Sequence, residues 1–296
     1  MADTVEMQDI RGMDIDKLAK GFADQEFIFK SACQVSTMTG DSIRWYRKTS
    51  GTLSATSPST LETAPLATPT TIEQSWTRYT SYPKKYMVEG FISEEDIKSA
   101  DLDVLATSVR DLTRAIVSRV DTEIYNIMTE YSSATGLPAP SAIQTFATTA
   151  VGGDQWDATS GQDPIKDILN AQRLLFAANY NAMEAVLYLN EYDYMSLVTW
   201  LISSKGSSIP GFSSEKVRSG VITEIVGTRI VVTTNATVDY GLMVIPQRAC
   251  TFKQYTPTRA TVIQDPMIGS KIRVSEAGVA YLTDPEAVVL ITDLKT

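Results

Sequence analysis

LDVLATSVRDLTRAIVSRVDTEIYNIMTEY, residues 102–131, is the most regular stretch of this 296-residue chain. Its apolar side chains recur every three or four positions, which is the spacing of one face of an α-helix. They are Leu102, Leu105, Val109, Leu112, Ile116, Val120, Ile124, Ile127 and Tyr131. The opposite face carries Asp103, Arg110, Asp111, Arg114, Ser118 and Arg119. The pattern therefore predicts a long amphipathic helix with one buried stripe.

The flanking residues suggest where this helix begins and ends. Ser93-Glu94-Glu95-Asp96 resembles a capping box, and Gly136 and Pro138 are expected to stop the helix. A helix of about thirty residues would be roughly 45 Å long. An isolated coiled coil is the alternative, but strand-like sequence on both sides favours packing against a sheet.

The sequence before the helix is predicted to form an arm and an extended hairpin. Residues 1–35 hold too few apolar side chains for a core of their own, so they are expected to pack on something else. Ser42–Arg47, Trp76–Tyr82 and Lys85–Phe91 alternate like strands. Between the first two, Thr49–Thr77 is mostly Thr, Ser and Pro, a composition that cannot close a hydrophobic core. The stretch is expected to be an extended loop, with plain disorder as the alternative.

The sequence after the helix mixes two shorter helices with many strands. Asp163-Pro164 is a cap and first-turn pair for a helix whose apolar positions are Ile165, Ile168, Leu169, Leu175 and Phe176. A buried strand at Ala185–Leu189 precedes a helix capped by Asn190–Asp193, and Gly220–Thr234 is predicted to form a hairpin that turns at Gly227-Thr228. Further strands are expected at Leu242–Ile245, Cys250–Tyr255, Ala260–Ile263, Lys271–Glu276, Val279–Leu282 and Ala287–Ile291. The fold class is α+β, because helices and strands are segregated.

Composition excludes several classes of protein. Lys and Arg number 26 against 35 Asp and Glu, a net charge of −9, which disfavours tight binding to nucleic acid phosphates. The absence of histidine rules out Ser-His-Asp and Cys-His catalysis and the usual imidazole metal sites. Cys33 and Cys250 are expected to be buried reduced thiols. The longest apolar run, Ala287–Ile291, is too short for a membrane helix, and the acidic start of the chain favours synthesis in a cytoplasm.

Four local strings, in this order, resemble the major capsid proteins of tailed double-stranded DNA phages, which share the Hong Kong 97-like fold. Lys85–Ile97 resembles the family's strand entering its spine helix, and Arg119–Ile124 resembles the acidic end of that helix. Glu224–Thr234 is similar to a hairpin of the axial domain, although Arg229 replaces the usual proline. Ala277–Val289 resembles the terminal return strand. The match covers most of residues 40–292.

The resemblance implies a division of the chain. Residues 1–35 would be the N-terminal arm, and residues 36–92 the extended loop with its flanking strands. Residues 93–199 and 246–296 would form the peripheral domain with the spine helix, and residues 200–245 the axial domain.

The resemblance also implies a role and partners. The chain would be a major capsid protein, a structural protein that self-assembles through hexamers and pentamers into the icosahedral shell of a bacteriophage virion. Its other partners would be a portal and a cement protein. Since the sequence shows no long coiled-coil region of the kind that serves as a fused scaffold, the resemblance implies a separate scaffolding protein or a scaffold removed before this sequence begins. Packaged DNA would lie near the shell without tight binding, no membrane is involved, and assembly would take place in the host cytoplasm. No cofactor, no metal site, and no catalytic or cofactor-binding residue is expected.

Two other functions stay open. An encapsulin-type nanocompartment has the same fold, but such shells usually have a shorter loop. A histidine-free enzyme would need paired carboxylates, for which Glu94, Glu95 and Asp96 or Glu123 and Glu130 are the candidates. The first group is better explained as charge at a helix N-terminus and the second as a solvated face. One departure from cross-linking members of the capsid family is that Thr49–Thr77 contains no lysine.

Overall fold

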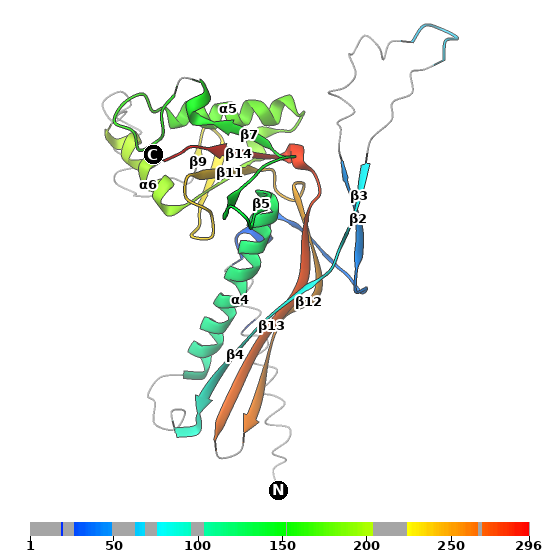
Figure 1. Cartoon of the computed structure of the whole chain (residues 1–296), viewed down its shortest axis with the longest axis vertical. Coiled ribbons are helices and arrows are strands. Elements are labelled where there is room, and N and C mark those ends of the chain that lie inside the picture. The colour runs from blue at the N-terminus through cyan, green and yellow to red at the C-terminus, as the bar shows by residue number, and fades with distance from the viewer. Residues whose placement is uncertain are drawn as a thin grey trace.

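The computed structural model describes residue 19 and residues 27–48, 63–68, 76–95, 104–151, 153–203, 224–265 and 268–295. Most of the predicted arm, most of the extended loop, Asp96–Asp103 and the predicted loop after residue 203 therefore lie outside the described residues. The described chain combines a long sheet, a six-stranded sheet and a projecting hairpin (Figure 1).

The long sheet and one helix form the elongated part of the molecule (Figure 1). Helix α4 spans Val104–Met128 and packs along the sheet, whose strand order is β1-β12-β13-β4. The strands are β1 (Gln34–Thr37), β12 (Cys250–Asp265), β13 (Gly269–Leu282) and β4 (Lys84–Ser93). A short helix, α2 (Phe29–Ala32), leads into β1.

The six-stranded sheet lies at one end of this unit (Figure 1). Its order is β7-β14-β11-β8-β10-β9, and helices α5 (Pro164–Ala177) and α6 (Glu191–Ser203) flank it. The strands are β7 (Gln144–Ala147), β14 (Val288–Thr292), β11 (Tyr240–Val244), β8 (Val186–Leu189), β10 (Thr228–Val232) and β9 (Glu224–Ile225). Smaller elements are β5 (Tyr131–Ser132), β6 (Leu137–Pro138) and the 3-10 turns η2 (Thr148–Val151), η3 (Ala182–Glu184) and η4 (Pro285–Ala287).

The long helix is confirmed, but it ends earlier than predicted. Val109, Ile116, Val120 and Ile124 are all buried. The backbone leaves the helix after Met128, because Glu130 adopts a left-handed φ of 51° that reverses the chain. Tyr131 then lies in β5, and Gly136, with a φ of 71°, serves the turn between β5 and β6 instead of stopping the helix. Ser93 is the last residue of β4, and Glu94 and Glu95 directly after it are helical, ahead of α4; the remainder of the predicted capping box lies outside the described residues.

Two predicted breaks in the late strands are absent. The segments expected at Cys250–Tyr255 and Ala260–Ile263 form the single strand β12, which shifts register against β13 around Thr256 and Arg259. Lys271–Glu276 and Val279–Leu282 likewise form the single strand β13. The residues between the two predicted segments of β12 are accommodated by an irregularity of register, which bends a strand without ending it.

Some smaller predictions need correction as well. In α5, Ile168 and Leu175 are fully buried, whereas Leu169 and Phe176 are 45% and 47% exposed and do not belong to the buried stripe. The cap by Asp163 is confirmed, since its Oδ1 accepts a hydrogen bond from the Lys166 N–H. The turn of the β9–β10 hairpin is made by Val226 and Gly227, both with positive φ, one residue earlier than predicted.

The first described residues pack into this chain's own core, contrary to the expectation that they pack elsewhere. The Phe29 ring is fully buried between Tyr125 of α4 and Tyr188 of β8, at centroid distances of 5.3 Å and 4.9 Å. The carboxylate of Asp121, on α4, accepts hydrogen bonds from the backbone N–H groups of Ile28 and Lys30 at 2.7 Å and 3.1 Å. These contacts join the long sheet to the six-stranded sheet.

Candidate functional site

The hairpin of β2 (Ile43–Lys48) and β3 (Trp76–Ser81) has many exposed side chains. It projects beside the body and forms a sheet of two strands (Figure 1). Tyr46 and Trp76 are 55% and 50% exposed, and Arg44 and Arg78 are exposed as well. A two-stranded ribbon is only marginally stable in water, and large exposed aromatic side chains mark contact surfaces. The hairpin is therefore a candidate interaction surface.

Aromatic stacking fixes the base of this hairpin to the body. Trp45 lies between Tyr79 of β3 and Tyr281 of β13, with ring centroids 4.8 Å and 4.7 Å apart and nearly parallel planes. Its indole N–H donates to Ser81 Oγ at 2.8 Å. Stacked pairs of this kind contribute about 1 kcal/mol beyond the burial of their surface. Sequence alternation predicted the strand but gave no sign of the partner on β13.

A charged contact next to the stack holds the hairpin to the end of α4. Arg47 lies 3.5 Å from Glu130 and donates to the Tyr79 hydroxyl at 3.0 Å. The second carboxylate oxygen of Glu130 accepts from the N–H groups of Ser141 and Ala142 at 2.5 Å and 2.7 Å. Burial alone would raise the pKa of Glu130, but these N–H donors outweigh it and lower the pKa below its ordinary value. Glu130 is therefore ionised and shared between the hairpin and the chain that follows α4.

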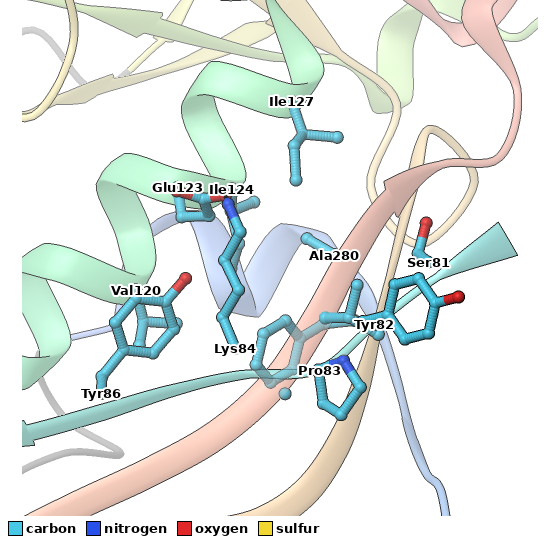
Figure 2. A pocket seen from close by; sticks show the side chains of 13 residues that line it. Ser81, Tyr82, Pro83, Lys84, Tyr86, Val120, Glu123, Ile124, Ile127 and Ala280 are labelled. Atoms are coloured by element: carbon cyan, nitrogen blue, oxygen red, sulfur yellow. Dashed lines mark hydrogen bonds and ion pairs between the residues drawn. The ribbon is translucent and has the colours of Figure 1, made fainter. Parts of the chain in front are cut away.

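A cavity of about 440 Å³ opens where the hairpin returns to the body (Figure 2). Its apolar wall includes Val120, Ile124 and Ile127 of α4. Lys84 reaches from β4 across the opening and forms an ion pair with Glu123 (Figure 2). The remaining lining residues are Ser81, Tyr82, Pro83, Tyr86, Phe252, Gly278, Val279 and Ala280. The cavity is large enough for one or two side chains and combines an apolar wall with a charged rim.

The face of the long sheet away from α4 is a second candidate surface. Gly90 faces α4, since an added Cβ would lie 2.9 Å from Leu112 Cδ1, so its neighbours Glu89 and Phe91 point to the other side. Met87 and Phe91 are each 52% exposed there, and Ile263 of β12 is 42% exposed. Glu89 is paired across the strands with Arg273 at 2.5 Å and 2.8 Å. A cavity of about 260 Å³ lies at the β12 bulge, lined by Pro83, Lys85, Tyr255, Thr256, Arg259, Ser275, Glu276 and Ala277.

The carboxylates weighed as catalytic pairs have structural partners. Glu123 pairs with Lys84 and Glu130 with Arg47, while Glu94 and Glu95 follow β4; Asp96 lies outside the described residues. Among the residues described, no three His, Cys, Asp or Glu side chains are grouped so that they could hold a metal ion. No helix within the described ranges is long and apolar enough to cross a membrane.

One buried ion pair lay outside every sequence-based expectation. Lys30 Nζ lies 2.5 Å from Glu276 Oε1 and 4.0 Å from the centre of the Phe27 ring, and Thr258 donates to the other oxygen of Glu276 at 2.9 Å. The charged partners are 246 positions apart, so no local spacing indicates them. The sequence shows only that Glu276 is the one acidic residue of β13.

Comparisons with known proteins were informative only at the level of three-dimensional structure. No protein-family model matches the sequence, and no curated protein matches it. The virus-like particle from Pyrococcus furiosus aligns with a TM-score of 0.61 and 12% identity over 95% of this chain and 99% of its own. The capsid of cyanophage P-SCSP1u aligns with a TM-score of 0.64 and 15% identity over 90% and 88%.

A structure from Mycobacterium phage Che8 aligns with a TM-score of 0.62 and 16% identity over 92% of this chain and 93% of its own. At such identities the likeness establishes the fold. At least nine-tenths of the chain takes part in each of these alignments.

Proposed function

We propose that this chain, which has the Hong Kong 97-like fold of viral capsid proteins, is the major capsid protein of a tailed double-stranded DNA virus. Its copies would associate into hexamers and pentamers and then into an icosahedral shell around the genome. The observation that carries this proposal is the alignment of about nine-tenths of the chain with capsid structures.

The exposed surfaces of the single subunit support self-association. The hairpin combines exposed aromatic rings with Arg44 and Arg78, while the whole chain carries a net charge of −9. A basic, aromatic ribbon on an acidic subunit is complementary to the surface of other copies. The apolar side chains Met87 and Phe91 on the open sheet face offer a second surface that a neighbouring copy would cover.

The proposal assigns the chain no catalytic role and no cofactor. Its partners besides further copies are a separate scaffolding protein, a portal and a cement protein, and DNA lies near the shell without tight binding. The acidic balance agrees with that last point, because a surface of the same sign as the phosphates disfavours adhesion. The mature location is the virion, with assembly in the host cytoplasm. Within the shell, the chain would be divided into the N-terminal arm, the extended loop, the peripheral domain and the axial domain, with the residue ranges given above.

An encapsulin-type nanocompartment is the second candidate function. The alignment with an archaeal virus-like particle, which covers 99% of that chain, is the observation that favours it. Such a shell would enclose an enzyme instead of a genome, and the 440 Å³ cavity beside α4 would be free to accept a cargo segment.

Electron microscopy of the full-length chain, expressed alone and with its neighbouring genes, tests the proposal. Closed particles or capsomers that contain DNA and no enzyme support a viral shell. Closed particles with a co-purifying enzyme and no DNA would replace it with the nanocompartment. A monomer under every condition, including after lysis of infected cells, would contradict both.

A further inference from the structure

The two cysteines of the chain lie side by side, although 217 positions separate them. Strand β1 runs parallel to β12 with Gln34 opposite Thr251, so Cys33, one residue before Gln34, is opposite Cys250. Both thiols are free and buried, with 3% and 1% of the residue exposed. Because residues that lie opposite each other on paired strands share one face of the sheet, the two thiol side chains are neighbours on that face.

The backbone on both sides of this pair is fixed. The carbonyl of Ala32 accepts from the Gln247 N–H at 2.7 Å, and the carbonyl of Lys30 accepts from the Cys33 N–H at 3.2 Å. Beyond the pair, the β1–β12 ladder continues to Thr37 and Gln254. Adjacent strands lie about 4.8 Å apart, within the Cα separation of roughly 4.4 to 6.8 Å that a disulfide requires.

We infer that Cys33 and Cys250 are the site of an intrachain disulfide, closed by a small disulfide oxidant such as oxidised glutathione, that locks residues 27–37 onto β12. The inference is independent of the proposed shell function, because it depends only on contacts within one subunit.

The reaction is a pair of thiol–disulfide exchanges. One protein thiolate attacks oxidised glutathione, forms a mixed disulfide and releases one glutathione. The second protein thiolate then attacks the protein sulfur of the mixed disulfide, forms the Cys33–Cys250 bond and releases the second glutathione. Two protein thiols are oxidised, one glutathione disulfide is reduced, and the two thiol protons end on the two released glutathione molecules.

The surroundings predict that the bond closes slowly in the folded subunit and is then durable. The hydrogen bond to Cys250, burial, and the nearby Asp121 carboxylate all raise the pKa of Cys33, so little thiolate is available to attack an oxidant. Burial also excludes glutathione. The disulfide should therefore form when the segment around α2 opens or while the chain folds, and it should resist reductants afterwards.

The central test is refolding of the full-length chain in a buffer of oxidised and reduced glutathione, which gives the oxidant access before burial. We expect a mass loss of about 2 Da, the two hydrogens removed. A non-reducing peptide map should show one fragment pair joined through Cys33 and Cys250. Because the bond closes a very long loop, the melting temperature should rise by roughly 5 °C or more relative to the reduced protein. Wild type with two free thiols, or with glutathione adducts and no internal bond, would overturn the inference.

A matched variant tests whether the disulfide depends on the position of Cys33 opposite Cys250 or only on the presence of two thiols in the chain. Cys33→Ser combined with Gln34→Cys moves the thiol by one residue, to an exposed position whose side chain points to the other side of the strand. This variant should form a mixed disulfide with glutathione and no internal disulfide. Its melting temperature should be the same after oxidative refolding as in the reduced protein. An internal bond in this variant equal to that of wild type would contradict the assignment of the site to the Cys33 position. The wild-type measurements do not depend on the variant's folding.

Discussion

Trp45 on the hairpin and Tyr281 on β13 stack with their ring planes 23° apart, and this contact ties the projecting hairpin to the C-terminal end of an inner strand of the long sheet. Together with the ion pair between Arg47 and Glu130, it sets the direction in which the hairpin leaves the body. The hairpin itself has only two strands, so its direction depends on its base.

Replacing the stacked indole should impair assembly more than folding. Trp45→Ala removes a contact of about 1 kcal/mol from a partly exposed site, so the melting temperature should fall by only a few degrees. Particle yield, measured by sedimentation, should fall by roughly tenfold or more, because a misdirected hairpin weakens the contacts between subunits and each 1.4 kcal/mol lost there is a factor of ten. Trp45→Phe keeps a stacked ring and should assemble nearly normally. Equal particle yields for Trp45→Ala and wild type would contradict the role given to the stack.

The carboxylate of Asp121 should be required to hold the first described residues in place. Asp121→Ala leaves the N–H groups of Ile28 and Lys30 without their acceptor, which should cost about 2 kcal/mol in the free energy of unfolding. Limited proteolysis should then cleave near residues 27–33 much faster than in wild type. Asp121→Asn retains an oxygen acceptor and should show an intermediate rate. Identical cleavage in all three proteins would mean that this contact does not hold the segment.

The close approach at Gly278 predicts a stability defect from one added methyl group. A Cβ there would lie 2.5 Å from Phe252 Cζ and 2.9 Å from the carbonyl oxygen of Lys253. Gly278→Ala should therefore lower the free energy of unfolding by about 2 kcal/mol through overpacking. Gly40→Ala is the matched control, because its Cβ would meet only the Ser42 carbonyl oxygen, at 3.5 Å. The prediction fails if both variants unfold at the same denaturant concentration.

Asp167 should make the subunit more stable when the pH falls from 7 to 5. Burial raises its pKa to about 6, even though the Trp156 indole N–H donates to its carboxylate at 2.9 Å. The folded state therefore binds the proton more tightly than the unfolded state does, so this contribution is fully present below the unfolded pKa and is lost as pH rises through about 6. Between pH 7 and pH 5 the gain should be about 1 kcal/mol.

Denaturant titrations of wild type and Asp167→Asn, followed by tryptophan fluorescence, measure this contribution. The variant lacks the titrating group. Between pH 7 and pH 5, the free energy of unfolding of wild type should therefore rise by about 1 kcal/mol relative to that of the variant. If acidification instead lowers the free energy of unfolding of wild type relative to that of the variant, the pH dependence assigned to Asp167 has the wrong sign.

Mature particles should dissociate in hot detergent without leaving covalent oligomers. Residues 49–77 contain no lysine, so this stretch has no amine to deliver to a neighbouring carboxamide. A single band near 32.4 kDa is expected on a denaturing gel under reducing conditions. A ladder of pentamer-sized and hexamer-sized species would show that a cross-link exists and that its lysine lies elsewhere.

Local pattern was sufficient to predict most elements but not their partners. Helix α4, the two strands of the hairpin and the cap by Asp163 each depend on residues within a few positions, and the sequence displays them directly. The end of α4 was placed too late, because the reversal uses Glu130 with positive φ, a conformation that glycine more often adopts. The hydrogen bonds of that carboxylate to Ser141 and Ala142 compensate for its backbone strain.

The candidate surfaces were predicted only in part, for the same reason. Alternation predicted the two strands of the hairpin, whereas most of the polar stretch between them lies outside the described residues. The stack on Tyr281, the ion pair of Lys30 with Glu276 and the contact between the two thiols all join positions far apart along the chain, where no spacing rule applies.

The pairing of β4 with β13 has a consequence for the timing of biosynthesis. Ser93 is opposite Gly269 and Lys84 is opposite Gly278, so the strand that carries the hairpin finds its neighbour almost two hundred residues later. The ion pair of Lys30 likewise cannot form until Glu276 has been synthesised, 246 residues later. Such non-local contacts slow folding, since a long loop must close before any of them forms. A nascent subunit on the ribosome therefore lacks its long sheet until β13 has been translated, which keeps shorter nascent chains from presenting a correctly oriented hairpin to folded subunits.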